Sequence, residues 1–449
     1  MPGNPLEFQE SLIMRPAVDQ TARETGNRGQ IVFVAWLSNA FTYCNFFMYG
    51  TAAALVFGPV FFDHLDAGWR EVAALGTFGA GYIARPLGAL VLGHVGDRFG
   101  RDKALGLSLV LMGVSTVLIG VLPSYAVAGV AAPVGLVLLR LVQGFAIPGA
   151  HAGTFSIAIE SAPSKRRALF ASFAISGTAF GFIAATLVFI PVMALPHDQL
   201  PSWGWRIPFF LGAATLWLGC RMGFSTPELR IFEHERNRVR VERIPGLELL
   251  RAHKRAVLRV GMAALVATVS SVSSFFVLSQ AVNGSGVPAA TMLSMLVISS
   301  FIAMFTTPAW AWVADQVGRR PVFMAGAIGS ATLTWPLLWA VDQANVALIF
   351  IFGILQNSLA YSASNGVAPS LYAEMFPAHV RVSGTAFGIQ IGLLAAGMGP
   401  GLSAVLMQHE SLGWMSVASF VTVVCVVATL AAWSAQETVD VSMDRLDER

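Results

Sequence analysis

Charged residues are scarce in this sequence. Asp, Glu, Lys and Arg make up 12% of its 449 residues, whereas hydrophobic residues make up 55%. A typical soluble protein is about 25% charged. Too few charged side chains are present to cover a water-soluble protein of this length. The composition therefore excludes a soluble globular domain and indicates that lipid covers much of the surface.

Cysteine is also rare, with only three residues in the chain. No CxxC pair and no Cys/His spacing typical of zinc or of a redox site occurs. We interpret the cysteines as small apolar packing residues, so the sequence predicts no metal site and no cofactor. They are Cys44, Cys220 and Cys425.

Long apolar windows recur along the whole chain. A helix needs about 20 apolar residues to cross the hydrocarbon of a bilayer. The windows predict an all-α polytopic membrane protein with twelve transmembrane helices in two six-helix bundles. They cover residues 31–57, 70–93, 104–122, 131–157, 168–194, 207–224, 257–282, 290–313, 321–341, 346–369, 382–406 and 413–434.

Positive charges are unevenly distributed among the loops that these spans define. If the N-terminus is cytoplasmic, 24 of the 28 Lys and Arg residues fall on the cytoplasmic side. This asymmetry follows the positive-inside rule and supports both the span number and the orientation. It predicts a multi-pass protein of the plasma or inner membrane with both termini in the cytoplasm. The lipid bilayer, and not nucleic acid, is the partner that this charge distribution indicates.

A basic stretch at 225–256 separates spans six and seven, and we interpret it as a cytoplasmic linker. The predicted organisation is a cytoplasmic tail at 1–30, a first bundle at 31–224, this linker, a second bundle at 257–434 and a cytoplasmic tail at 435–449. We expect a monomer.

The two predicted bundles repeat each other in sequence. An Asp-x-x-Gly-Arg motif follows span two and recurs 218 positions later, after span eight. A Glu-x-x-Pro-x-x-x-Arg motif follows span four and recurs 214 positions later, after span ten. Two patterns with nearly one offset indicate a parallel duplication, and such folds place the translocation site between the halves.

The segment from Gly93 to Arg101 resembles the loop motif of the major facilitator superfamily, and Asp315 to Arg319 resembles its second copy. The resemblance implies transport by alternating access, with spans one, four, seven and ten lining the cavity. It also implies that contacts of both loops gate the cytoplasmic side. The gating candidates are Asp97, Arg98, Gly100, Arg101, Asp315, Gly318 and Arg319.

Further segments resemble the metabolite:proton symporter family, whose members carry organic acids such as shikimate and osmolytes such as proline and betaine. Three of that family's carboxylates are missing: Thr42 and Asn45 replace two in span one, and Ala150 replaces one in span four. His151 and Glu160 are the candidates to take over proton coupling, and uncoupled facilitation is the alternative. The matching segments are Tyr49-Gly50, Ala84–Gly88, Gly93–Arg101, Arg140–Gly144, Glu160–Pro163 and Trp203–Phe209.

Three ionisable residues lie deep within the predicted spans, namely Arg85, Arg140 and His151, and no Asp or Glu lies near a span centre. A charge at the bilayer centre costs about 2.5–3.5 kcal/mol on insertion scales. Each of these residues is therefore a candidate for a functional role. Arg140 is expected either to bind an anionic substrate or to fill a structural role. A structural role fits Arg85 better, and a neutral hydrogen-bonded core residue fits His151 better.

Neutral polar residues form stripes on two spans. One helical face of span one carries Thr42, Asn45 and Tyr49, and one face of span ten carries Asn357 and Tyr361. A stripe of this kind either binds substrate or hydrogen-bonds to neighbouring helices. For span ten we favour the cavity.

We therefore expect a secondary transporter of a small organic acid or related polar metabolite, with the proton as a candidate second substrate. An exporter of an amphipathic compound is the alternative. An enzyme is not expected, because no nucleophile–base or metal cluster occurs at membrane depth. The substrate-binding candidates are Arg140, Thr42, Asn45, Tyr49, Asn357, Tyr361 and Arg85.

Overall fold

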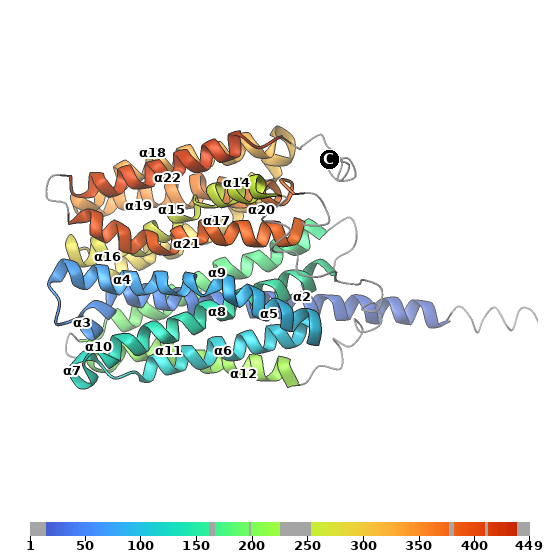
Figure 1. Ribbon diagram of the computed structural model, residues 1–449, viewed down its shortest axis with the longest axis horizontal. Helices are drawn as coiled ribbons and strands as arrows, with labels where there is room; N and C mark the ends of the chain where they lie inside the picture. The colour runs from blue at the N-terminus through green and yellow to red at the C-terminus, as the bar shows by residue number, and fades with distance from the viewer. Residues whose placement is uncertain are drawn as a thin grey trace, which may run out of the picture.

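The computed structural model describes residues 15–160, 167–196, 199–224, 253–376, 381–408 and 412–437. Within these residues the chain is almost entirely helical, and the helices run roughly parallel in two stacked bundles (Figure 1). The N-terminal half forms one bundle and the C-terminal half forms the other, which confirms the predicted architecture. Most of the predicted linker and of the C-terminal tail lies outside the described residues.

The first bundle is interrupted in its second and sixth spans. Span two changes helix at Ala84, and Pro86 occupies the first turn of the new helix, where its missing amide hydrogen is tolerated. The spans are α2 (Arg15–Leu55), α4 (Ala67–Ile83) with α5 (Arg85–Phe99), α6 (Arg101–Val121), α8 (Ala131–Glu160), α9 (Arg167–Met193), and α11 (Ile207–Phe210) with α12 (Gly212–Phe224). The connectors are α3 (Phe57–Phe61), α7 (Tyr125–Ala128), α10 (Gln199–Ser202) and the 3₁₀ helix η1 (Gly204–Arg206).

Span one begins earlier than its apolar window predicts. The helix α2 starts at Arg15, inside the segment predicted as a polar tail. Pro16 falls in its first turn, where proline is compatible with a helix, and no proline follows within α2. An apolar window detects only the part of a helix that lies in the hydrocarbon of the bilayer. A polar extension of the same helix is therefore not predicted from it.

The second bundle contains π-helical segments in spans seven and ten. Such segments are rare and occur frequently at functional sites. Span seven comprises α14 (Lys254–Ala264), α15 (Ala267–Ser271), η3 (Val272–Phe276), α16 (Val277–Ser279) and η4 (Gln280–Gly284). Span ten comprises α19 (Val346–Ile354), η5 (Leu355–Tyr361) and α20 (Ser362–Ala373), and the remaining spans are α17 (Ala289–Val317), α18 (Arg319–Asp342), α21 (Arg381–Met407) and α22 (Trp414–Trp433).

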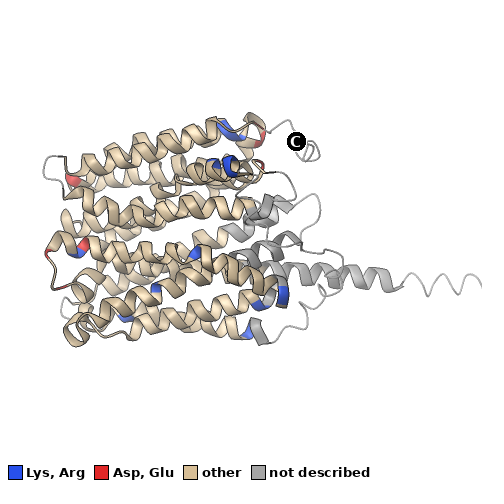
Figure 2. Cartoon of the chain, viewed as in Figure 1, with Lys and Arg blue, Asp and Glu red and all other residues tan. Residues whose placement is uncertain are grey.

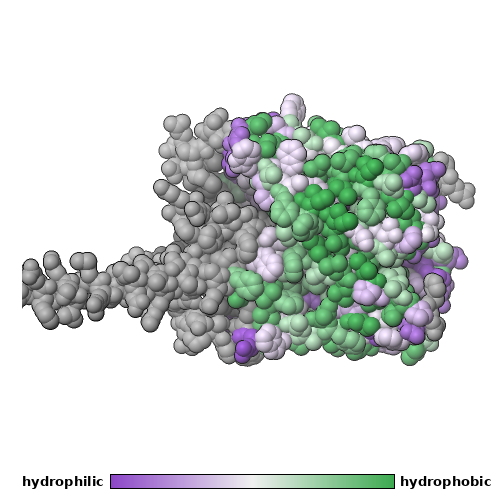
Figure 3. All heavy atoms as spheres, turned by 180° about the vertical axis from the view of Figure 1, so that it is seen from behind, coloured by the Kyte–Doolittle hydropathy of each residue, from purple (hydrophilic) through white to green (hydrophobic). Residues whose placement is uncertain are grey.

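The exterior fits a bilayer. Ten helices of the described part are long and apolar enough to cross a membrane. Hydrophobic side chains cover the middle of the face in Figure 3, and charged residues gather mainly at the two ends of the bundles in Figure 2. We call the end at which α5 joins α6 and α17 joins α18 the terminal face, because α2 begins there, and the opposite end the distal face.

The two copies of the loop motif fold alike. Gly100 joins α5 to α6 with φ 109° and ψ 146°, and Gly318 joins α17 to α18 with φ 107° and ψ 151°. Residues with a side chain rarely adopt this backbone conformation, which explains why each copy of the motif has glycine at this position. The sequence repeat is therefore also a repeat in backbone geometry.

Both motifs of the second bundle meet at the terminal face. Arg319 lies between Asp315, at 3.5 Å, and Glu374, at 3.4 Å. The carboxylate of Glu437 accepts hydrogen bonds of 3.0 Å from the backbone amides of Arg319 and Arg320. A carboxylate is stabilising at a helix N-terminus, so these contacts join the start of α18 to span ten and to the end of span twelve.

We predict that Gly318→Ala lowers stability by about 1–2 kcal/mol, because φ is positive and a Cβ would lie 2.8 Å from Glu437 Oε2. Thermal unfolding of the purified protein in detergent measures the loss. Gly93→Ala is the matched control, since a Cβ there meets nothing within 4 Å. Equal melting temperatures for the two variants would contradict the assignment.

Candidate translocation site

A cavity of about 450 Å³ lies between the two bundles. Spans one, two and five of the first bundle and spans seven, eight, ten and eleven of the second line it. Span ten contributes from Asn357 to Pro369, which is the half nearer the terminal face. No described residue of span four is among the lining residues, although the resemblance implied that span four lines the cavity. The cavity extends toward the terminal face.

The bundles touch on the distal side of this cavity. A Cβ at Gly79 of α4 would lie 3.0 Å from the Gly397 carbonyl oxygen of α21. Farther toward the distal face, Asn283 of η4 donates a 3.0 Å hydrogen bond from Nδ2 to the carbonyl oxygen of Ala54. The structure is therefore a state that is closed distally and hollow toward the terminal face.

Arg85 lies in the wall of the cavity, at the break between α4 and α5. Its side chain is only 3% exposed, and its guanidinium carbon lies 3.9 Å from the Tyr82 ring centre and 4.8 Å from that of Phe46. Among the described residues it forms no hydrogen bond and no ion pair. Arg85 is therefore a buried positive charge that faces the cavity without a described counter-ion.

Arg140 lies outside the cavity, inside the first bundle. Its guanidinium carbon is within 4.8 Å of three aromatic ring centres, and its Nη1 donates a 3.0 Å hydrogen bond to Gln143 Oε1. Cation–π contacts and hydrogen bonds stabilise a desolvated guanidinium. The rings are those of Phe46, Tyr49 and Phe78.

The predicted stripe of span one does not reach the cavity. Thr42 donates a hydrogen bond to the Ser38 carbonyl at 2.8 Å, and Asn45 Nδ2 donates one to Thr215 Oγ1 at 2.6 Å. Tyr49 is fully buried beside Arg140. Thr42 thus bonds within α2, whereas Asn45 and Tyr49 contact other helices of the first bundle. The neighbouring face of α2 lines the cavity with Tyr43, Phe46 and Phe47.

The predicted stripe of span ten does reach the cavity. Asn357 and Tyr361 both line it, together with Asn365 one turn farther along. The side chain of Asn357 is held in place by span seven, because its Nδ2 donates a 2.9 Å hydrogen bond to Ser273 Oγ. Structure and sequence pattern agree on which face of span ten is turned inward.

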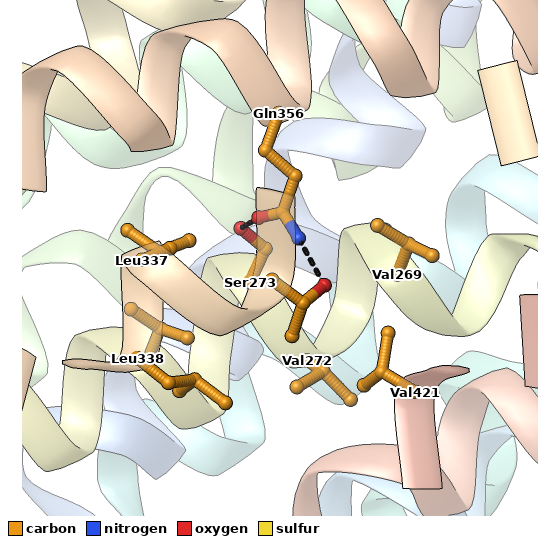
Figure 4. Close-up of a pocket in the computed structure, with 9 residues that line it drawn as sticks. Val269, Val272, Ser273, Leu337, Leu338, Gln356 and Val421 are labelled. Atoms are coloured by element: carbon orange, nitrogen blue, oxygen red, sulfur yellow. Dashed lines mark hydrogen bonds between the residues drawn. The ribbon is translucent and has the colours of Figure 1, made fainter. Parts of the chain in front are cut away.

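A polar network behind the cavity holds spans seven, nine and ten together. Ser273 of η3 donates a 3.1 Å hydrogen bond to Gln356 Oε1, and Gln356 Nε2 donates a 2.6 Å bond to Thr334 (Figure 4). The groups are buried among valine and leucine side chains. Buried polar groups that satisfy one another fix a unique packing, so the network sets the orientation of η3 and η5.

Tyr43 and Tyr82 are cavity residues that the sequence analysis missed. Both line the cavity, and the positive charge of Arg85 acts on the Tyr43 hydroxyl. Tyr82 lies three residues before Arg85, on the same face of the helix, and this spacing was the available signal. With Tyr361 of span ten, they place three phenol rings from both bundles around one space.

Several candidates are not tested by these contacts. His151 and Glu160 lie on α8 and Asp97 and Arg101 on α5 and α6, but their side chains fall outside the described residues. Arg98 is exposed at the terminal face, 5.4 Å from the centre of the Phe99 ring. Gating by these groups remains a prediction.

Comparisons with known proteins agree with this geometry. The sequence profile of the Major Facilitator Superfamily matches residues 35–306, and the profile described as Sugar (and other) transporter matches residues 231–449. The shikimate transporter of Escherichia coli is 33% identical over 395 residues, which cover 86% of this chain and 90% of that protein. The proline/betaine transporter of Salmonella typhimurium is 29% identical over 442 residues, which cover 94% of this chain and 86% of that protein.

Solved structures share the fold. A crystal structure of the D-xylose-proton symporter matches with a TM-score of 0.73 at 19% identity and covers 91% of this chain and 98% of that chain. A partially occluded inward-open conformation of the xylose transporter XylE from E. coli matches with a TM-score of 0.73 at 20% identity, over 92% of this chain and 99% of that chain. With more than half of its residues inside the superfamily profile, this chain belongs to the Major Facilitator Superfamily and is a membrane transporter of small metabolites.

Proposed function

We propose that this chain transports small organic acids, or related polar metabolites, that carry one carboxylate. The observation that carries the proposal is the buried guanidinium of Arg85, which faces the cavity without a hydrogen bond or ion pair among the described residues. A substrate carboxylate fits this position, because the N–H groups of arginine bind a carboxylate in a forked geometry.

The rest of the cavity fits the remainder of such a molecule. Asn357 and Tyr361 supply neutral hydrogen-bonding groups from the second bundle. The rings of Phe47, Phe182 and Phe275 supply an apolar surface near span seven. A volume of about 450 Å³ lies within the range of small-molecule sites. The compounds for which two relatives are named, shikimate and proline/betaine, each carry one carboxylate, which supports the proposal.

Transport proceeds by alternating access in this proposal. The terminal face is cytoplasmic, as the positive-inside asymmetry of the loops indicates. The described state then holds the cavity toward the cytoplasm, and the Asp-x-x-Gly-Arg loops gate that side. Arg319 is the gating candidate whose contacts are described, with Asp315 and Glu374 as its partners.

An exporter of an amphipathic compound is the second candidate. The aromatic part of the cavity wall favours it, because flat apolar rings bind hydrophobic molecules with little polar specificity. Efflux of a hydrophobic cation from vesicles would support the exporter. Saturable uptake of an organic acid supports the carrier.

We predict that Arg85→Gln weakens binding of a monocarboxylate by about 10- to 100-fold, because a hydrogen-bonded pair with a charged group contributes about 1.5–3 kcal/mol. Isothermal titration of the purified protein, with organic acids first selected by thermal shift, measures this loss. Arg85→Lys is expected to retain part of the affinity, since it keeps the charge and loses the fork. Arg206→Gln, on the distal face, is the control. Affinity within twofold of wild type in Arg85→Gln would refute the carboxylate site.

We predict that Arg140→Gln lowers stability and leaves substrate affinity nearly unchanged. The substitution removes three cation–π contacts and a guanidinium that packs in the bundle interior, so we expect a loss of about 2 kcal/mol in stability. The Kd of the folded protein for the same acid stays within about threefold of wild type. Thermal unfolding and titration separate the two effects. An unchanged melting temperature with a large loss of affinity would instead assign Arg140 to the substrate.

We also predict that a protonophore prevents accumulation of the radiolabelled acid in proteoliposomes. His151→Gln or Glu160→Gln, whichever removes the coupling group, abolishes accumulation and leaves substrate counterflow intact, because exchange needs no net proton movement. Accumulation that is indifferent to the protonophore would identify facilitated diffusion or another coupling ion.

A further inference from the structure

Glu71 is an acidic residue within α4 that neither the repeated motifs nor the cavity explains. Its side chain is half-buried near the distal end of the helix, and its Oε1 atom is buried without a hydrogen-bond partner. The side chain of Ser279 in α16 approaches the carboxyl group. Glu71 belongs to the first bundle and Ser279 to the second, so this contact crosses the distal closure.

The contact is part of a wider polar connection between the bundles. Asn283 Nδ2 donates hydrogen bonds to the Ala54 carbonyl oxygen at 3.0 Å and to Ser279 Oγ at 3.1 Å. The distal ends of α2, α4 and span seven are thereby joined through one chain of polar groups.

The charged groups around Glu71 are engaged elsewhere. Arg70 pairs with Asp63 at 3.3 Å and donates to the carbonyl oxygens of Asp63 and Leu65. Asp66 is exposed at the start of α4. Span seven and α2 present the neutral groups described above, and Gln408, directly after α21, lies beside Gly68. No described cation compensates a negative charge on Glu71.

We propose that Glu71 is a proton-binding site whose occupation is linked to closure of the distal face. In the closed state the carboxyl group is half-buried at the interface with an unpartnered oxygen, and a neutral carboxylic acid is less costly there than a carboxylate. Opening of the distal face separates Glu71 from Ser279 and exposes it to water, where the ionised form is favoured at neutral pH. Protonation therefore favours closure, and opening releases the proton.

The position of Glu71 makes this proton a regulator of closure and not the coupling ion. Along α4, Phe78 comes between Glu71 and the cavity residue Tyr82, and its ring centre lies 4.5 Å from that of Phe275 in the cavity wall. The proton exchanges with the distal solution only. The inference rests on the alternating-access part of the proposed function, but not on the identity of the substrate.

Spin-label distances across the distal face test the site without substrate. Val127 and Gln343 are exposed on distal loops of the two bundles and accept labels after replacement by cysteine, in a background with the three native cysteines replaced by serine. In nanodiscs, we expect the closed-to-open ratio to rise as the pH falls from 8 to 5, by at most about tenfold per pH unit for one linked carboxyl group. Glu71→Gln stays closed at every pH, because its neutral amide mimics the protonated acid.

Two further variants separate titration from packing. Asp66→Asn removes an exposed distal carboxylate and keeps the wild-type pH response. Ser279→Ala removes the contact partner, lowers the closed fraction at every pH and keeps the pH dependence. The proposal is overturned if the wild-type distances do not change with pH, or if Glu71→Gln retains the wild-type response. Substrate affinity of the same samples, measured separately, reports on the Arg85 site, so the two proposals fail independently.

Discussion

The constraint that shapes this molecule is the cost of a positive charge in a region without water. Two buried guanidinium groups lie in the first bundle, between its terminal and distal ends. Their surroundings stabilise the positive charge in different ways. Arg140 is surrounded by three aromatic rings and hydrogen-bonds to Gln143. Arg85 rests on two rings in the wall of the cavity. Arg140 is held by groups of its own bundle, whereas Arg85 forms no hydrogen bond or ion pair among the described residues.

A single ring links the two arginines. The Phe46 centroid lies 4.3 Å from the guanidinium carbon of Arg140 and 4.8 Å from that of Arg85. Phe46 also contacts Phe78 and Tyr82 on α4. The aromatic cluster therefore supports both positive charges. It also forms the inner end of the cavity, so charge compensation and cavity shape depend on the same side chains.

The closed distal side and the hollow terminal side use different chemistry. Glycines let α4 and α21 approach closely, and the polar chain through Asn283 joins the distal helix ends. At the terminal face the contacts of Arg319 stay within the second bundle. Bundles held together by a narrow seam of small residues can rock on it, which fits alternating access in the superfamily. The buried hydrogen bonds of Gln356 join spans seven, nine and ten within the second bundle.

Sequence alone determined the number of spans, the division into two bundles and the duplication, because these depend on the length of apolar windows and on motif spacing along one chain. It also indicated the inward face of span ten, where Asn357 and Tyr361 repeat with the helical period. The positions of Arg85 in the cavity wall and of Arg140 inside the bundle, and the lining face of span one, were decided only by tertiary structure. Neighbouring residues of a helix point about 100° apart, so Thr42 and Tyr43 meet different environments. Local polarity does not reveal which face a partner helix covers and which faces the space between the bundles.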